Sequence, residues 1–153
     1  MSQKLVAYFS PSGHTAALAE KLAAAASAAI CEIKRATPYT ADDLNWHNKQ
    51  SRSSVEMRDR SSRPAIAPFA ADLMAYDTVY IGFPIWWYIA PTIINTFLES
   101  ADFSGKRIIL FATSGGSGFG KAAENLQPSA PGAKIIVGKV NPSPADIEVL
   151  AKL

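Results

Sequence analysis

Hydroxyl side chains and a glycine lie close together near the start of the chain, where Ser10, Ser12, Gly13 and Thr15 follow an apolar run. Hydroxyls, and the backbone amides that a glycine leaves accessible, are donors that suit a phosphate group. His14 lies among them and can also donate a hydrogen bond, whichever charge its ring carries. The stretch therefore predicts a phosphate site at the start of a helix. An ordinary Ser/Thr-capped helix start without a ligand explains the same residues.

Aromatic side chains dominate a second stretch, Pro84-Ile85-Trp86-Trp87-Tyr88. The proline at its start favours a loop over a continued strand, and large flat side chains in a loop are suited to stacking on an aromatic ligand. The alternative is that the tryptophans belong to the core. Their position in a loop that begins with proline favours the ligand.

Glycine and serine dominate a third stretch, residues 113–120, TSGGSGFG. Its glycines let backbone donors and acceptors approach a planar ring closely. The overlapping segment 115–122, GGSGFGKA, is one residue short of the G-x-x-x-x-G-K-[ST] loop of nucleotide triphosphatases. Ala122 lacks the hydroxyl that would hold magnesium, and no hydrophobic strand ends in an aspartate that would supply the second metal contact. The sequence therefore disfavours a triphosphatase and predicts no metal site.

Short apolar runs alternate with helical patterns around these stretches. Residues 5–9 form an uncharged run typical of a strand buried on both faces, and from Thr15 the apolar positions recur at helical spacing. Further strands are predicted at 30–34, 77–83, 106–112 and 134–140, and helices at 14–29, 53–60, 66–74, 91–100, 121–126 and from 144 onward. The polar segment 39–64 is predicted to be a surface excursion.

This alternation predicts an α/β three-layer sandwich, with helices on both faces of a parallel sheet. We predict a five-stranded sheet of order 2-1-3-4-5 in a single domain over residues 1–153. That order makes the first, third and fourth strands neighbours. Ligands bind such sheets at the carboxyl ends of the strands, where the strand order reverses. The three stretches therefore converge on one edge and predict a pocket for a phosphorylated aromatic cofactor.

The composition argues against several other classes of protein. Hydrophobic residues make up 48% and charged residues 18%, as in soluble globular proteins, and we see no apolar stretch that could cross a bilayer. The formal net charge of +2 gives no argument for a nucleic-acid partner. Met1 stands so close to the first strand that no signal peptide fits, so we expect a cytoplasmic protein.

Taken together, these motifs resemble those of flavodoxins, in particular a branch with a G-x-P-I-W-W loop. The resemblance covers nearly the full length. It rests on YFSPSGHT at 8–15 beside the family's S-x-T-G-N-T phosphate loop, YDTVYIGFPIWW at 76–87, TFLES at 96–100 and GKRIILFATSGGSG at 105–118. It implies bound FMN, with the phosphate in the first loop and the isoalloxazine ring between the other two. The implied cofactor-binding residues are Ser10, Ser12, Gly13, His14, Thr15, Pro84, Ile85, Trp86, Trp87, Ser114, Gly115, Gly116, Ser117 and Gly118.

The chain departs from the flavodoxin pattern at several positions. Ser12 replaces threonine and His14 replaces asparagine, and each keeps a hydrogen-bonding group. Trp86 and Trp87 stand where many flavodoxins have a flexible glycine peptide. Flavodoxins that shuttle electrons between proteins are typically strongly acidic, whereas this chain has a sequence pI of about 8.7.

The resemblance implies a redox protein in which FMN carries the chemistry and no side chain acts as a catalyst. Its electron partner is either a redox protein or a small-molecule acceptor. One alternative is an NAD(P)H-dependent reductase of quinones or similar small molecules, with Arg52, Arg58 and Tyr88 lining the substrate face. Another is a flavodoxin-fold binding module that has lost FMN. A monomer and a homodimer both fit the sequence.

Overall fold

The computed structural model describes residues 4–10, 13–34, 66, 76–85, 90–114, 118–119 and 122–153. The excursion predicted at 39–64 and the helix predicted at 53–60 lie outside these residues. Of the helix predicted at 66–74, only Ile66 is described. Ile66 forms an isolated β-bridge and packs against the core, so the prediction that a helix begins there is wrong.

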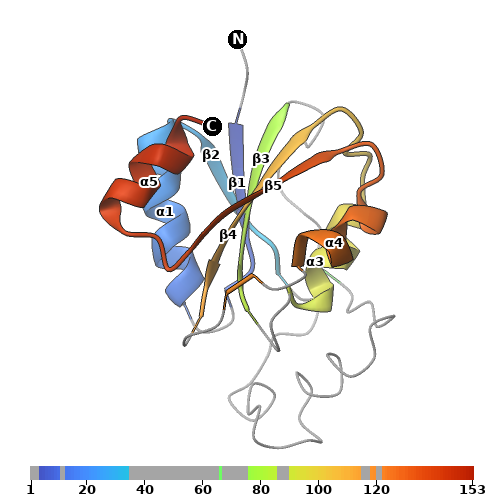
Figure 1. Ribbon diagram of the computed structural model, residues 1–153, viewed down its shortest axis with the longest axis horizontal. Helices are drawn as coiled ribbons and strands as arrows, with labels where there is room; N and C mark the ends of the chain where they lie inside the picture. The colour runs from blue at the N-terminus through green and yellow to red at the C-terminus, as the bar shows by residue number, and fades with distance from the viewer. Residues whose placement is uncertain are drawn as a thin grey trace, which may run out of the picture.

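A parallel five-stranded sheet of order β2-β1-β3-β4-β5 forms the centre of the molecule (Figure 1). Its strands are β1 (Lys4–Tyr8), β2 (Ala29–Glu32), β3 (Thr78–Pro84), β4 (Arg107–Thr113) and β5 (Lys134–Val140). The strand order predicted from the sequence is confirmed.

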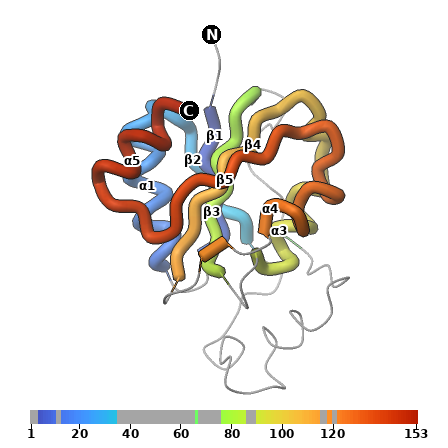
Figure 2. Tube along the Cα trace, in the orientation of Figure 1, coloured from blue at the N-terminus to red at the C-terminus, as the bar shows by residue number. Residues whose placement is uncertain are grey.

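Helices cover both faces of the sheet (Figures 1 and 2). The α-helices of the described residues are α1 (His14–Ala26), α3 (Thr92–Glu99), α4 (Ala122–Leu126) and α5 (Pro144–Ala151), with a 3-10 turn, η2 (Gln127–Ser129), after α4. Helices α1 and α5 pack together on one face, and α3 and α4 lie on the other. This arrangement confirms the α/β sandwich.

The core lies in two layers because successive strand residues point to opposite faces of the sheet. Tyr80 and Ile109 are aligned on neighbouring strands and pack with α1 and α5. Ile81 and Leu110, the next residues on each strand, pack with α3 on the other face. All four side chains are fully buried, so the central strands are apolar on both faces, as the uncharged runs predicted.

Helix α1 is shorter than the predicted 14–29. It ends at Ala26 because Ser27 has a φ of 53°, in the left-handed region. The backbone N–H of Ala28 then donates to the carbonyl of Ala23 over 2.9 Å, the pattern that closes many helix ends. Strand β2 can therefore begin at Ala29, one residue earlier than predicted.

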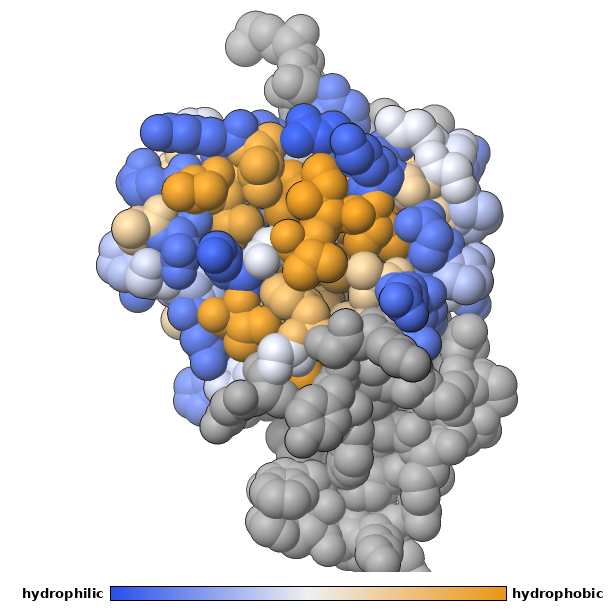
Figure 3. Space-filling model, viewed as in Figure 1, coloured by the Kyte–Doolittle hydropathy of each residue, from blue (hydrophilic) through white to orange (hydrophobic). Residues whose placement is uncertain are grey.

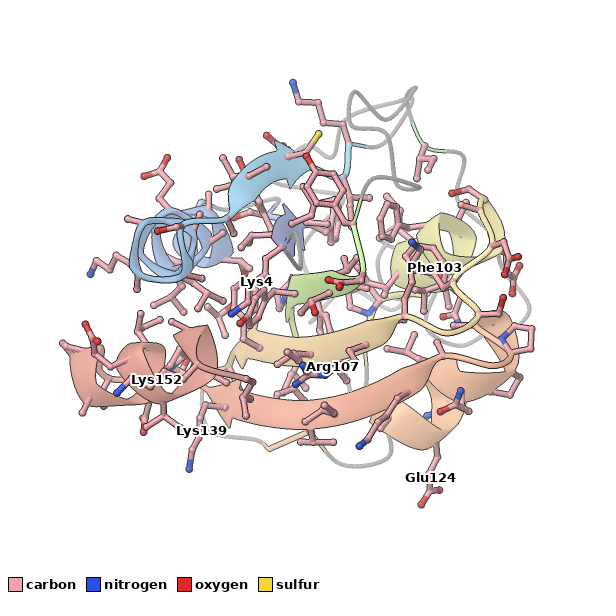
Figure 4. All side chains as sticks on the ribbon, turned by 90° about the horizontal axis from the view of Figure 1, so that it is seen from above. Lys4, Phe103, Arg107, Glu124, Lys139 and Lys152 are labelled. Atoms are coloured by element: carbon pink, nitrogen blue, oxygen red, sulfur yellow. The ribbon has the colours of Figure 1, made fainter. Side chains whose placement is uncertain are left out.

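The carboxyl end of α5 is fixed by side chains from the amino-terminal half of the sheet. Lys4 Nζ donates to the carbonyl of Ala151 over 2.8 Å, and the Tyr80 hydroxyl donates to that of Leu150 over 2.7 Å. Figure 4 looks onto this end of the sheet, with Lys4 and Arg107 at the starts of β1 and β4. Burial raises the pKa of Tyr80, while the charge of Arg107 acts in the opposite direction. The phenol therefore stays protonated and keeps its donor role.

Strand β5 forms one edge of the sheet, and apolar side chains gather over β5 and α5 on that face (Figure 3). Val137 and Val149 are 50% and 59% exposed there. Lys134 and Lys139 are also exposed on β5, and exposed lysines are typical of edge strands that avoid pairing with another chain. The described residues among those predicted to be functional lie elsewhere, at or after the carboxyl ends of the inner strands.

Candidate functional site

The carboxyl ends of β1, β3 and β4 lie side by side at one edge of the sheet, at the lower end of Figure 1. Tyr8 is aligned with Gly82, and Pro84 is aligned with Thr113. The segments that follow these strands contain the three stretches singled out in the sequence. Their predicted convergence on one edge of the sheet is therefore confirmed for the described residues.

The first predicted stretch leads directly into α1. Gly13 has a φ of 90°, which favours glycine, and it is followed by His14, the first residue of the helix. The Ser10 hydroxyl accepts a hydrogen bond from the backbone N–H of Ala16 over 3.0 Å. No acidic side chain lies in the first turn of α1. The partial positive charge of this helix start is thus not offset within its own first turn, which suits an anion.

The side chain of Thr15 points into the protein and not into solvent. Its side chain is only 1% exposed, and its hydroxyl oxygen lies 2.9 Å from the hydroxyl oxygen of Thr113, the last residue of β4. A hydroxyl can donate one hydrogen bond and accept two, so this contact leaves hydrogen-bonding capacity on both side chains. The contact joins the first turn of α1 to the end of β4.

The end of β3 is joined to the same residue of β4. The backbone N–H of Ile85 donates to the carbonyl of Thr113 over 2.9 Å. Pro84 and Ile85 are half-buried, and Ile85 packs against the core beneath α3. Thr113 therefore holds two neighbouring segments, the first turn of α1 through its hydroxyl and the residue after β3 through its carbonyl.

The glycine-rich segment is fixed at its start and near its end. Both backbone groups of Ser114 are paired with the side-chain amide of Asn141, which follows β5. Gly118 is exposed, and Phe119 packs edge-on against the buried Phe83, with ring centroids 6.3 Å apart. The two anchors leave Ser114 and Gly118 at the edge where the three strand ends meet.

Of the predicted site residues, the structure describes Ser10, Gly13, His14, Thr15, Pro84, Ile85, Ser114 and Gly118. The other predicted site residues, Ser12, Trp86, Trp87, Gly115, Gly116 and Ser117, lie outside the described residues, as do Arg52, Arg58 and Tyr88. His14 and Gly13 are exposed, and Ser10 is half-buried.

Sequence reasoning missed three residues that hold this site together: Thr113, Phe119 and Asn141. The sequence marks Thr113 only as the first residue of the glycine-rich stretch. Asn141 carries a weak signal, since asparagine directly after a strand is typical of a turn that needs a positive φ. Its φ is 47°. Phe119 carries none beyond being an apolar residue among glycines.

The described part of the chain offers neither a metal site nor a membrane-spanning helix. There, no three histidine, cysteine or acidic side chains gather closely enough to hold a metal ion. In the same residues, no helix has the length and apolar character needed to cross a membrane.

Comparison with known proteins gives consistent matches. A family model described as Flavodoxin matches residues 3–152. A candidate flavoprotein from Bacteroides uniformis ATCC 8492 is 49% identical, with 99% of each chain covered and a TM-score of 0.91. A candidate flavoprotein from Bacteroides eggerthii DSM 20697 is 45% identical, with 99% of this chain and 97% of that one covered and a TM-score of 0.92.

A more distant structure shares the fold. It is a flavoprotein in complex with FMN from Lactobacillus acidophilus NCFM, 22% identical, with 92% of this chain and 94% of that chain covered and a TM-score of 0.73. The comparison with curated proteins gave no match.

Proposed function

Because this chain belongs to the flavodoxin family, we propose that it binds FMN non-covalently and transfers electrons through it. When bound, FMN supplies the redox chemistry, and the protein supplies binding, orientation and electrostatics. The proposed unit is a single domain over residues 1–153 with no catalytic side chain.

One observation supports this proposal above all: Thr113 holds both the start of α1 and the start of the aromatic loop, and the next residue begins the glycine-rich loop. Its hydroxyl pairs with Thr15, its carbonyl accepts from Ile85, and Ser114 follows it directly. A donor-rich helix start and the beginnings of an aromatic loop and a glycine-rich loop are therefore held together. A phosphorylated planar molecule needs this combination of surfaces.

The helix start fits the phosphate of FMN. Gly13 adopts a left-handed conformation, and a Cβ added there would have no atom within 4 Å, so the backbone is open to a ligand. The first turn of α1 has no acidic side chain to repel the anion. The residues proposed to bind the phosphate are Ser10, Ser12, Gly13, His14 and Thr15.

The other two loops are proposed to hold the isoalloxazine ring. The half-buried Ile85 packs its side chain against the core and begins the aromatic loop. Gly118 is exposed, and a Cβ added there would also have no atom within 4 Å. The residues proposed to flank the ring are Pro84, Ile85, Trp86 and Trp87 on one side and Ser114, Gly115, Gly116, Ser117 and Gly118 on the other. The FMN complex of the Lactobacillus acidophilus flavoprotein supports the choice of FMN.

The sequence GFPIWW at 82–87 supports placing the chain in the flavodoxin branch with a G-x-P-I-W-W loop. Such a protein needs an electron partner. We propose that the chain is cytoplasmic, that its partner is a redox protein or a small-molecule acceptor, and that it is a monomer or homodimer. Strongly acidic flavodoxins are steered to basic partners by their charge. The formal net charge of +2 of this chain favours a partner that binds without such steering. A reductase of small molecules with NAD(P)H as donor is the second candidate that this charge favours.

The test is a visible spectrum of freshly purified protein, repeated after addition of FMN and then of NADPH without oxygen. Absorption bands at roughly 370 and 450 nm, where oxidised flavins absorb, are expected. Loss of these bands with NADPH alone would identify a reductase, and their persistence an electron carrier that needs a partner. If the protein shows no bands and takes up no FMN, the redox function is wrong and a binding module without flavin remains.

A further inference from the structure

Strand β5 contains one more residue than its neighbour near the candidate site. Leu110 is aligned with Val137, but Ala112 is aligned with Val140, so two steps along β4 face three along β5. Gly138 lies in this bulge. A Cβ added there would lie 2.2 Å from the carbonyl oxygen of Leu110, so the close approach of the two backbones requires glycine.

The bulge determines which residue leaves β5 beside the end of β4. That residue is Asn141, whose backbone N–H donates to the carbonyl of Ala112 over 2.8 Å. Its positive φ of 47° is tolerated better by asparagine than by almost any other residue with a side chain. Without the extra residue in β5, a different side chain would stand at this position.

The side-chain amide of Asn141 pairs with both backbone groups of Ser114. Its Oδ1 accepts from the Ser114 N–H over 3.0 Å, and its Nδ2 donates to the Ser114 carbonyl over 2.8 Å. A primary amide presents the same donor and acceptor as a peptide group. Asn141 thus continues the hydrogen-bonding between β4 and β5 one residue beyond the sheet.

From this geometry we propose that Asn141 is a positioning residue for the flavin ring. It acts by fixing the direction in which the chain leaves β4. The inference rests on the proposed function, because the segment that begins at Ser114 is the one proposed to flank the isoalloxazine ring. A loop already ordered in its binding conformation loses less conformational entropy when the ligand binds. Asn141 contributes affinity in this way without touching the flavin.

Replacing Asn141 is expected to weaken the binding of the flavin ring and not that of the phosphate. FMN and riboflavin share the ring, and only FMN has the phosphate. Asn141→Gly keeps the left-handed backbone and removes both side-chain hydrogen bonds. It should raise the Kd of both flavins by a similar factor, about tenfold, as expected from two lost hydrogen bonds. The midpoint potential of bound FMN should also shift, because loop groups beside the ring are less well placed.

Ser27→Gly is the matched control. Ser27 is the other non-glycine residue with positive φ in the described part of the chain, and it lies at the far end of α1. The control should leave both Kd values and the potential unchanged. Asn141→Asp is a second variant that keeps an acceptor for the Ser114 N–H but loses the donor to the Ser114 carbonyl. It should also raise the Kd of both flavins, so it tests the proposal if Asn141→Gly does not fold.

The experiment separates this inference from the proposed function. If the unaltered protein binds FMN and the folded Asn141 variants bind FMN and riboflavin within about twofold of it, the positioning role is wrong while the proposed function stands. A loss confined to FMN would also contradict the inference, because it would place the effect at the phosphate. If the unaltered protein binds neither flavin, both proposals fail.

Discussion

The hydroxyl oxygens of Thr15 and Thr113 lie 2.9 Å apart, although the two residues are 98 positions apart in the sequence. This contact joins the start of α1, which is proposed to bind phosphate, to the end of β4, where the proposed ring site begins. The proposed phosphate and ring regions are therefore linked by a direct hydrogen bond. The carbonyl of the same Thr113 accepts from the backbone N–H of Ile85, which belongs to the proposed ring site.

Removing either hydroxyl of this pair should lower the stability of the protein, because the remaining hydroxyl loses its hydrogen-bonding partner. Thr15→Val leaves the Thr113 hydroxyl without this partner, and Thr113→Val does the same to the buried Thr15. We expect each to lower the free energy of unfolding by about 1 kcal/mol, and the double variant to lose clearly less than the sum. Urea denaturation of the four proteins measures the coupling. Strictly additive losses would mean that the hydroxyls do not interact.

The same variants test whether Thr15 also contacts the phosphate. Thr15 is among the residues proposed to bind the phosphate of FMN, and Thr113 is not. If the Thr15 hydroxyl binds the phosphate, Thr15→Val should weaken FMN by more than Thr113→Val does, while circular dichroism shows an intact fold. Equal losses in the two variants would assign Thr15 a supporting role only.

Ser10 is expected to serve both the helix and the ligand. Its hydroxyl accepts from the Ala16 N–H, so Ser10→Ala should lower the free energy of unfolding by about 1 kcal/mol and weaken FMN more than riboflavin. Ser143→Ala is the matched control, because the Ser143 hydroxyl caps α5 by accepting from the Asp146 N–H. The control should lose stability but keep its preference for FMN. A similar change of preference in both variants would mean that the effect is general destabilisation.

Gly82 is required by packing on β3. A Cβ added there would lie 2.2 Å from the ring of the fully buried Phe111, so Gly82→Ala should destabilise the protein by about 1–3 kcal/mol through overpacking. Gly118→Ala is the control, since an added Cβ meets no atom within 4 Å. Its thermal midpoint should stay close to that of the unaltered protein. Equal midpoints for both variants would show that Phe111 moves aside at little cost.

Asp146 should make stability depend on pH. A hydrogen bond from the backbone N–H of Ser143 holds the pKa of Asp146 below its ordinary value. A lowered pKa in the folded state means that the carboxylate stabilises the protein above the unfolded pKa of about 3.9, and that this contribution disappears as the pH falls through the folded pKa. The thermal midpoint of the unaltered protein should therefore fall more steeply between about pH 5 and pH 2 than that of Asp146→Asn. Parallel curves would show that the capping carboxylate contributes nothing.

The strand order and the convergence of the loops followed from local patterns. Uncharged apolar runs such as residues 5–9 mark strands buried on both faces, and the helical spacing after Thr15 marks a crossover helix. The rules for parallel sheets then allow few topologies. The order 2-1-3-4-5 predicts that the three unusual loops begin at one edge, and the strand order of the structure brings their described residues there.

The contacts that fix the site could not be predicted because they join residues far apart in the sequence. The partner of Thr15 comes from the end of β4, and the partner of Ser114 lies 27 residues away, beyond a bulge in β5. Neither pairing produces a periodic pattern in the sequence from which it could be predicted. The end of α1 was missed for a different reason: alanine continues a helix well, and the left-handed conformation of Ser27 depends on the backbone bonds around it.

FMN binding is tested most sharply by a titration of the flavin-free protein with FMN and with riboflavin. The two ligands differ only in the phosphate that the start of α1 is proposed to bind. Charge-assisted hydrogen bonds to the phosphate should make FMN bind about a hundredfold more tightly, or better. Equal affinities would mean that the start of α1 does not bind the phosphate, and the absence of binding by either ligand would contradict the flavin function itself.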